Sequence, residues 1–291
     1  VFSETKAEYT VDITFVEDAG SEDIMNFKNK FTYRNTKVTA SWRDNLGDYG
    51  ILKCLGNYMS YEKIGTELNL YCQGSNRGIG LELVKESLNK NYSVLGTFRD
   101  KLKSKELYEI NSNSLNIFEM DVINEDSILN VSNNLTKPLD YLICNAGINN
   151  GFGNLFDSDH SHTSMLNVLN VNILGCVLTI KYLKKNLNSN AKIVLISSTL
   201  GIQQHIGSNA TIYRASKAAV NNIMVSVSEE LKSENITVVS FHPGWVRTDM
   251  GGANATLSAK ESAKELIKSF ENLSFKDTGK FFNYEGTIIN F

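Results

Sequence analysis

A strand, a glycine-rich turn and a helix follow one another between residues 68 and 88, and this succession constrains the fold more than any other feature of the chain. The apolar run 68–72 is typical of a buried strand, and residues 81–88 have the spacing of an amphipathic helix. Glycines at such a turn let the backbone approach a pyrophosphate, and the helix N-terminus offers free N–H groups. The sequence therefore predicts a cofactor-binding turn, with an ordinary turn as the alternative. Its residues are Gly74, Ser75, Asn76, Arg77, Gly78, Ile79 and Gly80.

Strand and helix patterns alternate from residue 66 to the end of the chain. Strands are expected at about 67–73, 92–98, 115–121, 139–145, 191–197, 236–241 and 280–284, with amphipathic helices between them and a long helix at about 161–188. This alternation predicts an α/β fold with a Rossmann-type, doubly wound parallel sheet that binds ligands at the carboxyl ends of its strands.

A tyrosine and a lysine stand four residues apart, at Tyr213 and Lys217, shortly after the strand that ends in Ser197 and Ser198. On a helix this spacing places both side chains on one face. A cation at ~4–6 Å would lower the pKa of the phenol by roughly 2–3 units, which would make it a proton donor near neutral pH. The pattern alone is also compatible with a plain surface pair.

Four motifs in this order resemble the short-chain dehydrogenase/reductase family. They are the glycine turn, Asn145-Ala146-Gly147 after an apolar strand, Ser198, and Tyr213 with Lys217. Three segments are similar in sequence to the C-factor and Sniffer-type carbonyl reductase branch: residues 74–80, residues 242–252 and the closing residues 283–286. The resemblance covers about residue 66 to the C-terminus, and departs from the branch between Gly201 and Tyr213, where one wall of the substrate pocket is expected.

The resemblance implies a role for each motif residue. Ser198, Tyr213, Lys217 and Asn172 would form the catalytic set, with Asn172 holding a water in line with the lysine. The cofactor would be held by the glycine turn and by Asp121, Val122, Asn145, Ala146, Gly147, Tyr213, Lys217, Pro243, Gly244, Val246 and Thr248. Asp121 and Asn145 also suit ordinary turns, and a helix asparagine such as Asn172 could simply face a loop.

Two arginines near the adenosine ribose favour NADP(H) over NAD(H). Arg99 ends the second strand, where an NAD-preferring protein would offer an acidic side chain, and Arg77 lies in the glycine turn. Guanidinium groups form bidentate, charge-assisted bonds to phosphate, so the pair would suit a 2′-phosphate. The alternative is that Asp100 pairs with Arg99 in a surface salt bridge.

Residues 1–65 precede this catalytic domain, which is predicted to span residues 66–291, and form an N-terminal extension of unknown role. Alternating residues at 9–16 and 31–42 predict two or three short strands there. The extension is either a packing or oligomer-stabilising appendage, or a module that gates substrate or binds a partner. The chain starts at Val1, so a targeting segment, if one existed, is already removed.

Composition argues against several other classes of protein. With 291 residues, 42% hydrophobic residues and a net charge of −3, the chain can bury one large core and does not have the composition of a disordered or nucleic-acid-binding protein. No apolar run is expected to reach the length of a membrane span. Four unpaired cysteines suggest the cytoplasm or an organelle lumen rather than secretion. No metal is predicted, and a homodimer or homotetramer fits the family.

The leading hypothesis is an NADPH-dependent oxidoreductase that reduces a small-molecule aldehyde, ketone or quinone carbonyl to an alcohol. A sugar-nucleotide epimerase shares the tyrosine–lysine pair but would have a different glycine spacing and a longer C-terminal domain. A regulatory or signalling protein that binds the cofactor with little or no turnover is the other alternative. The intact set of Ser198, Tyr213 and Lys217 argues against loss of catalysis.

Overall fold

The computed structural model describes residues 9–10, 37–43, 48–55, 58–66, 68–151, 153–156 and 160–291. The chain divides into two compact units, with the boundary between Leu68 and Asn69. The first unit contains a four-stranded sheet of order β1-β2-β3-β4, parallel between β1 and β2 and antiparallel elsewhere. Its strands are β1 (Tyr9–Thr10), β2 (Lys37–Arg43), β3 (Asp48–Leu55) and β4 (Tyr58–Thr66).

Within this first unit, β1 and β2 fall in the two ranges where alternation predicted strands, and the other parts of those ranges lie largely outside the described residues. Alternation did not predict β3 and β4. These two strands pair with each other in an antiparallel register that shifts between Tyr49 and Gly50.

The second unit is built on a seven-stranded sheet of order β13-β10-β9-β8-β5-β6-β7, in which every pairing is parallel. Its strands are β5 (Asn69–Cys72), β6 (Ser93–Phe98), β7 (Leu115–Glu119), β8 (Leu139–Cys144), β9 (Leu187–Ile196), β10 (Thr237–His242) and β13 (Phe281–Asn283). A small parallel pair joins β11 (Val246–Arg247) to β12 (Leu257–Ser258). The predicted strands and the Rossmann-type doubly wound sheet are confirmed.

Helices connect the strands in the order that the alternation predicted. The α-helices are α2 (Gly78–Asn89), α3 (Lys105–Tyr108), α4 (Glu125–Asn134), α5 (His162–Leu169), α6 (Gly175–Leu183), α7 (Thr211–Glu230) and α8 (Ala259–Glu271). Short helical turns are η1 (Lys101–Lys103), η3 (Lys184–Asn186), η4 (Thr199–Gly201), η5 (Lys232–Glu234) and η6 (Phe275–Asp277), and a π-helical turn, η2 (Asn170–Leu174), joins α5 to α6. The predicted long helix is therefore a helical stretch with a π turn in its middle.

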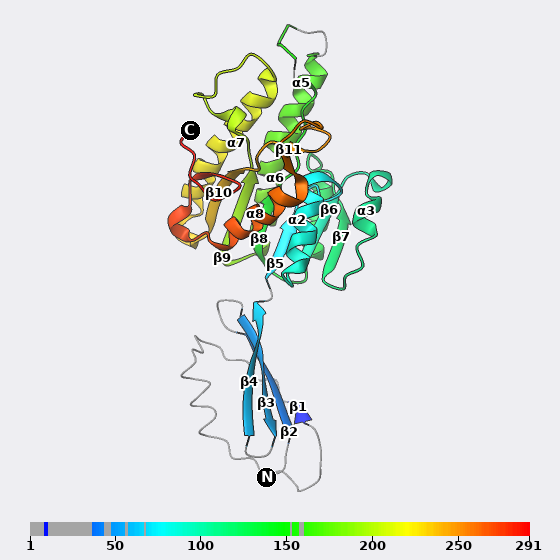
Figure 1. Ribbon diagram of the computed structural model, residues 1–291, viewed down its shortest axis with the longest axis vertical. Helices are drawn as coiled ribbons and strands as arrows, with labels where there is room; N and C mark the ends of the chain where they lie inside the picture. Colours follow the sequence, from blue (N-terminus) through cyan, green and yellow to red (C-terminus); the bar gives the residue numbers. More distant parts are fainter. Residues whose placement is uncertain are drawn as a thin grey trace. The chain divides into compact units, whose positions relative to one another are not determined.

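Alternating side chains of the strands build a core on each face of the large sheet. Tyr71 and Leu142 pack with residues of α4, α6 and α7 on one face. The neighbouring positions Cys72 and Ile143 are also buried and point to the opposite face. There α2 packs against α8, which Figure 1 shows together in front of the strands. Both faces are covered, as a parallel sheet requires.

The helical stretch His162–Asn186 is long and apolar enough to cross a membrane, judged by length and composition alone. The expectation that no apolar run reaches this length is therefore wrong. In the structure Val171, Cys176, Ile180 and Leu183 of this stretch pack into the core against the sheet. The apolar character of the stretch is that of a core helix.

Candidate active site

The glycine turn between β5 and α2 is shaped to receive an anion. Gly74 and Gly78 adopt φ values of +68° and +54°, which favour glycine. A Cβ on Gly80 would lie 2.2 Å from the carbonyl oxygen of Gly74. No side chain caps the start of α2, and its first turn carries no acidic residue. The first N–H groups of the helix and its positive dipole end therefore fit the pyrophosphate of a dinucleotide.

The two arginines predicted to meet the adenosine ribose have different surroundings. Arg77 forms an ion pair with Asp249, and both side chains are exposed. Arg99 is exposed and makes no hydrogen bond or ion pair within the described part of the chain. Asp100 instead accepts a hydrogen bond from the backbone of Leu102 at 3.0 Å and lies 3.8 Å from the ammonium of Lys103. The alternative pairing of Asp100 with Arg99 is therefore not formed.

Gln73, the last residue before the glycines, organises the neighbouring strand ends. Its amide accepts a hydrogen bond from the backbone N–H of Ala146 at 3.2 Å and donates to the Thr179 hydroxyl on α6 at 2.7 Å. Asn145 in turn donates to the carbonyl oxygens of Gln73 and Gly74 at 2.9 and 3.2 Å. Sequence reasoning missed Gln73. Its side chain shares the sheet face of Tyr71, so alternation could have identified it as a buried amide in need of partners.

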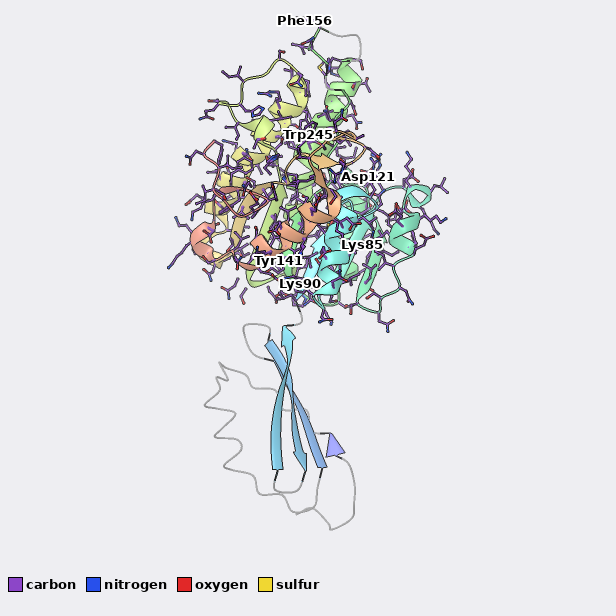
Figure 2. The ribbon with its side chains drawn as sticks, in the orientation of Figure 1. Lys85, Lys90, Asp121, Tyr141, Phe156 and Trp245 are labelled. Atoms are coloured by element: carbon purple, nitrogen blue, oxygen red, sulfur yellow. The ribbon has the colours of Figure 1, made fainter. Side chains whose placement is uncertain are left out.

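Asp121 and Val122 follow β7 and close a turn. The carboxylate of Asp121 accepts a hydrogen bond from the backbone of Ile123 at 3.1 Å. Val122 packs so closely on Gly175 that a Cβ there would lie 2.7 Å from its side chain. Figure 2 shows Asp121 and Trp245 towards the same end of the large sheet, where the strands end.

Asn172 is buried on the π-helical turn and has a full set of partners. Its side chain accepts a hydrogen bond from the backbone N–H of Ile148 at 2.8 Å and donates to the carbonyl of Ile148 and the hydroxyl of Ser216, at 2.9 and 3.0 Å. A Cβ on Gly147 would lie 3.4 Å from both the Asn172 Oδ1 and the Lys217 Nζ. Asn172 therefore joins the loop after β8 to α7, close to Lys217.

Ser198, Tyr213 and Lys217 come together where β9 ends and α7 begins. The hydroxyl of Ser198 neighbours the phenol of Tyr213, whose pKa it lowers, and accepts from the backbone of Leu200 at 3.1 Å. Lys217 is 4% exposed, lies 5.7 Å from the ring centre of Tyr213, and donates to the carbonyl of Ile196 at 2.8 Å. The tyrosine–lysine pair is therefore buried, which excludes the plain surface pair.

Titration of the buried phenol differs from the sequence-based expectation. Burial raises the pKa of Tyr213 to about 12, although the neighbouring hydroxyl of Ser198 lowers it. Burial also lowers the pKa of Lys217. The expected fall of the tyrosine pKa below its usual value is wrong for the chain alone, because desolvation of the phenolate outweighs the stabilisation that its neighbours provide. The phenol is thus protonated at neutral pH.

The segment after β10 borders the glycine turn. Thr248 lies 3.2 Å from a Cβ placed on Gly78, so the two segments are in contact. Gly244 has a φ of +86°, and a Cβ there would lie 2.4 Å from Leu257. The carbonyl of Pro243 accepts from Ser262 at 2.7 Å. The indole of Trp245 donates to the carbonyl of Gly251 at 2.9 Å. Val246, the next residue, begins β11.

A surface hollow of about 450 Å³ lies at the opposite end of the strands, lined by residues of α6, η3 and the start of β9. Its walls carry several exposed lysines, and it contains none of the motif residues. The motif residues therefore do not lie in this hollow.

Residues 70–258 match the family model of the short chain dehydrogenases. The chain belongs to the short-chain dehydrogenase/reductase family. It is 35% identical over 161 residues to the C-signal protein of Myxococcus xanthus, which covers 54% of this chain and 96% of that protein. The family consists of oxidoreductases that bind a nicotinamide cofactor and act on small molecules.

Two solved structures place this short-chain dehydrogenase/reductase in the Sniffer and C-factor-like branch. The carbonyl reductase Sniffer of D. melanogaster has a TM-score of 0.73 and 30% identity, over 77% of this chain and 99% of that one. An NADPH-bound carbonyl reductase from chicken fatty liver has a TM-score of 0.71 and 30% identity, with the same coverage of both chains. The predicted family and branch are confirmed.

Proposed function

We propose that this protein is an NADPH-dependent reductase of an aldehyde, ketone or quinone carbonyl. The observation that carries the proposal is the buried pair of Ser198 and Tyr213, with the Lys217 ammonium 5.7 Å from the tyrosine ring centre on the same helix. A protonated phenol next to a second hydroxyl can bind and protonate one oxygen atom. These are the groups that carbonyl reduction requires from the protein.

Each residue of the set has a distinct part in the reaction. Ser198 donates a hydrogen bond to the substrate oxygen and thereby polarises the carbonyl. Tyr213 gives that oxygen its proton as negative charge develops on it. When bound, a reduced nicotinamide supplies hydride to the carbonyl carbon. Lys217 stabilises the phenolate that is left on Tyr213. Asn172 orients the backbone of Ile148.

The cofactor is held by the glycine turn, by the segment after β8 and by the segment after β10. Asn145 orients the glycine turn and the segment after β8, and Thr248 connects the segment after β10 to Gly78. Arg99 is free of partners in the described residues, and Arg77 can exchange Asp249 for a phosphate. Two guanidinium groups favour the 2′-phosphate of NADPH. The NADPH-bound state of the chicken carbonyl reductase, which is 30% identical, supports the same choice.

The test is oxidation of NADPH, followed by absorbance, with aromatic aldehydes, aliphatic ketones and quinones as substrates. We expect turnover with at least one of these classes, and none in the Ser198→Ala and Tyr213→Phe variants. Tight NADPH binding without turnover of any carbonyl would refute the reductase and favour a regulatory protein that retains the cofactor. Absence of NADPH binding would refute the cofactor assignment itself.

A further inference from the structure

A small recess lies against Tyr213, between the segment after β8, helix α5 and the start of α7. Asn149 and His160 line it together with the apolar side chains Met165, Val168 and Ile212. Its volume is about 10 Å³, which is room for about one oxygen atom. Tyr213, the proton donor of the proposed reaction, forms part of its wall.

Two polar atoms in this region are buried and have no hydrogen-bond partner among the described residues. They are Nδ2 of Asn149 and Nε2 of His160. The adjacent Asn150, in contrast, donates to the carbonyl and hydroxyl of Ser164 at 3.1 and 3.2 Å. A buried donor without a partner is destabilising, so a ligand that supplies an acceptor here recovers that free energy.

The chemistry of the lining selects an uncharged acceptor. The amide N–H of Asn149 donates to oxygen, and so does the imidazole of His160 in the tautomer that carries its proton on Nε2. No lysine or arginine lines the recess to neutralise a carboxylate, and Met165, Val168 and Ile212 make part of its lining apolar. Burial of an unpaired carboxylate in such surroundings is costly, whereas an ester or amide oxygen is accommodated once it is hydrogen-bonded.

We propose that Asn149 and His160 determine substrate specificity by binding an uncharged oxygen acceptor, such as an ester or amide carbonyl, that the substrate carries in addition to the carbonyl reduced at Tyr213. This inference rests on the proposed reductase function. It assigns to the site a preference for carbonyl compounds with a second oxygen over hydrocarbon analogues of the same shape.

The test compares matched substrates with the purified full-length protein and NADPH. Benzaldehydes with a meta or para methyl ester are each compared with the isopropyl benzaldehyde of the same substitution pattern, and with the corresponding free carboxylate. Asn149→Leu and His160→Phe should each lower kcat/KM for the preferred ester by about tenfold or more. They should leave kcat/KM for the isopropyl compound within about twofold, because only the acceptor contact is lost.

His162→Phe is the matched control, since His162 is exposed at the start of α5 and does not line the recess. If Asn149→Leu does not fold, His160→Phe carries the test alone. An equal fall in kcat/KM for the ester and for the isopropyl compound overturns the inference, because this is the result expected if the two side chains only hold a water. A preference for the carboxylate over the ester overturns it as well. Equal kcat/KM values for the ester and the isopropyl compound in the wild-type protein refute this inference alone, whereas no turnover of any aldehyde, ketone or quinone by the wild-type protein refutes the proposed function as well.

Discussion

The phenol of Tyr213 has two polar neighbours that act on it differently. Ser198 neighbours it and lowers its pKa, whereas the ammonium of Lys217 is hydrogen-bonded to the carbonyl of Ile196 at 2.8 Å. Burial outweighs these interactions and raises the tyrosine pKa to about 12. Without bound cofactor the tyrosine is therefore a protonated donor, which supports the proposed reduction of a carbonyl.

Replacement of Tyr213 by phenylalanine should abolish carbonyl reduction with little change in NADPH affinity. The lost hydroxyl is the proton donor, and general acid catalysis of this kind contributes roughly 10²–10⁴ in rate. Steady-state kinetics and a fluorescence titration with NADPH measure the two effects separately. The control is Tyr182→Phe, because the Tyr182 hydroxyl pairs with Glu125 away from the site. Activity of Tyr213→Phe above a few per cent of wild type would mean that another group supplies the proton.

Reversal of the charge at Arg99 should weaken NADPH binding far more than NADH binding. Loss of a charge-assisted bond to the 2′-phosphate, with an added repulsion, should cost about tenfold or more in affinity for NADPH. Titration of both cofactors by fluorescence measures the ratio for wild type and Arg99→Asp. Lys105→Asp is the matched control, since Lys105 is exposed and lies 3.7 Å from Glu109. Equal wild-type affinities for the two cofactors would contradict the preference.

The stability of the protein should depend on pH through His242. Burial, and then the nearby His205, lower the pKa of His242 to about 4. Between pH 4 and about 6.5 the unfolded chain binds a proton that the folded chain does not, so stability is full above about pH 6.5 and is lost as the pH falls. The loss should reach about 2 kcal/mol by pH 5.

Denaturant unfolding at pH 7.5 and pH 5 tests this dependence on His242. His242→Gln should show a smaller loss of stability at pH 5 than wild type, while His162→Gln, at an exposed position, should behave like wild type. An identical loss in all three proteins would show that other groups cause the acid sensitivity.

At the scale of elements, the C-terminal end of α8 is attached to the strands by a polar cluster. The ammonium of Lys192 on β9 donates to the carbonyls of Phe270 and Glu271, at 3.0 and 3.4 Å, and lies 5.1 Å from the ring centre of Tyr141. The carboxylate of Glu271 accepts from the Tyr92 hydroxyl at 2.7 Å. Figure 2 shows Tyr141 towards the end of the sheet opposite to Trp245. A cation at a helix C-terminus also complements the helix dipole.

Replacement of Lys192 by methionine should destabilise the protein by about 1–2 kcal/mol, because two carbonyls at the end of α8 lose a charged donor. The active site lies at the other end of the strands, so kcat/KM should not change. Denaturant unfolding measures the first effect and NADPH oxidation the second. Lys185→Met is the control, because Lys185 is exposed and donates to Asn133 at 2.8 Å. Equal stabilities of the two variants would show that the cluster around α8 is not a stabilising attachment.

At the scale of the whole molecule, the seven-stranded unit contains the glycine turn, the catalytic set and the closing strand β13 within residues 69–291. The match to the family model also lies wholly inside this unit, at residues 70–258. These observations support the proposal that the catalytic domain is complete without the N-terminal extension.

Deletion of residues 1–60 should therefore leave a folded protein that binds NADPH with an affinity close to that of the full chain. Each unit has its own sheet, and a domain with its own hydrophobic core can fold alone. Circular dichroism and a fluorescence titration test this. A soluble, folded product without cofactor affinity would mean that the extension contributes to the site, and that the predicted domain boundary is misplaced.

Much of the fold follows from the sequence because its signals are local. The seven strands of the large sheet, the turn at Gly74 and the spacing of Tyr213 and Lys217 depend on periodicity and on residues close in the chain. The π turn around Asn172 has no such local signal, because it depends on packing that a reading of neighbouring residues does not include. The antiparallel strands β3 and β4 were missed although Gly56-Asn57, the two residues between them in the sequence, is a hairpin signal.

The sequence by itself determined the α/β class, the order of the strands along the chain, the family and the identity of the motif residues. Only the tertiary structure decided which of these residues share an environment. Burial of Tyr213 raises its pKa to about 12, Gln73 joins Ala146 to Thr179, and Asn149 and His160 lie unpartnered in one recess. The physical reason is that desolvation and hydrogen bonding depend on every atom that surrounds a group, and those atoms come from segments far apart in the chain.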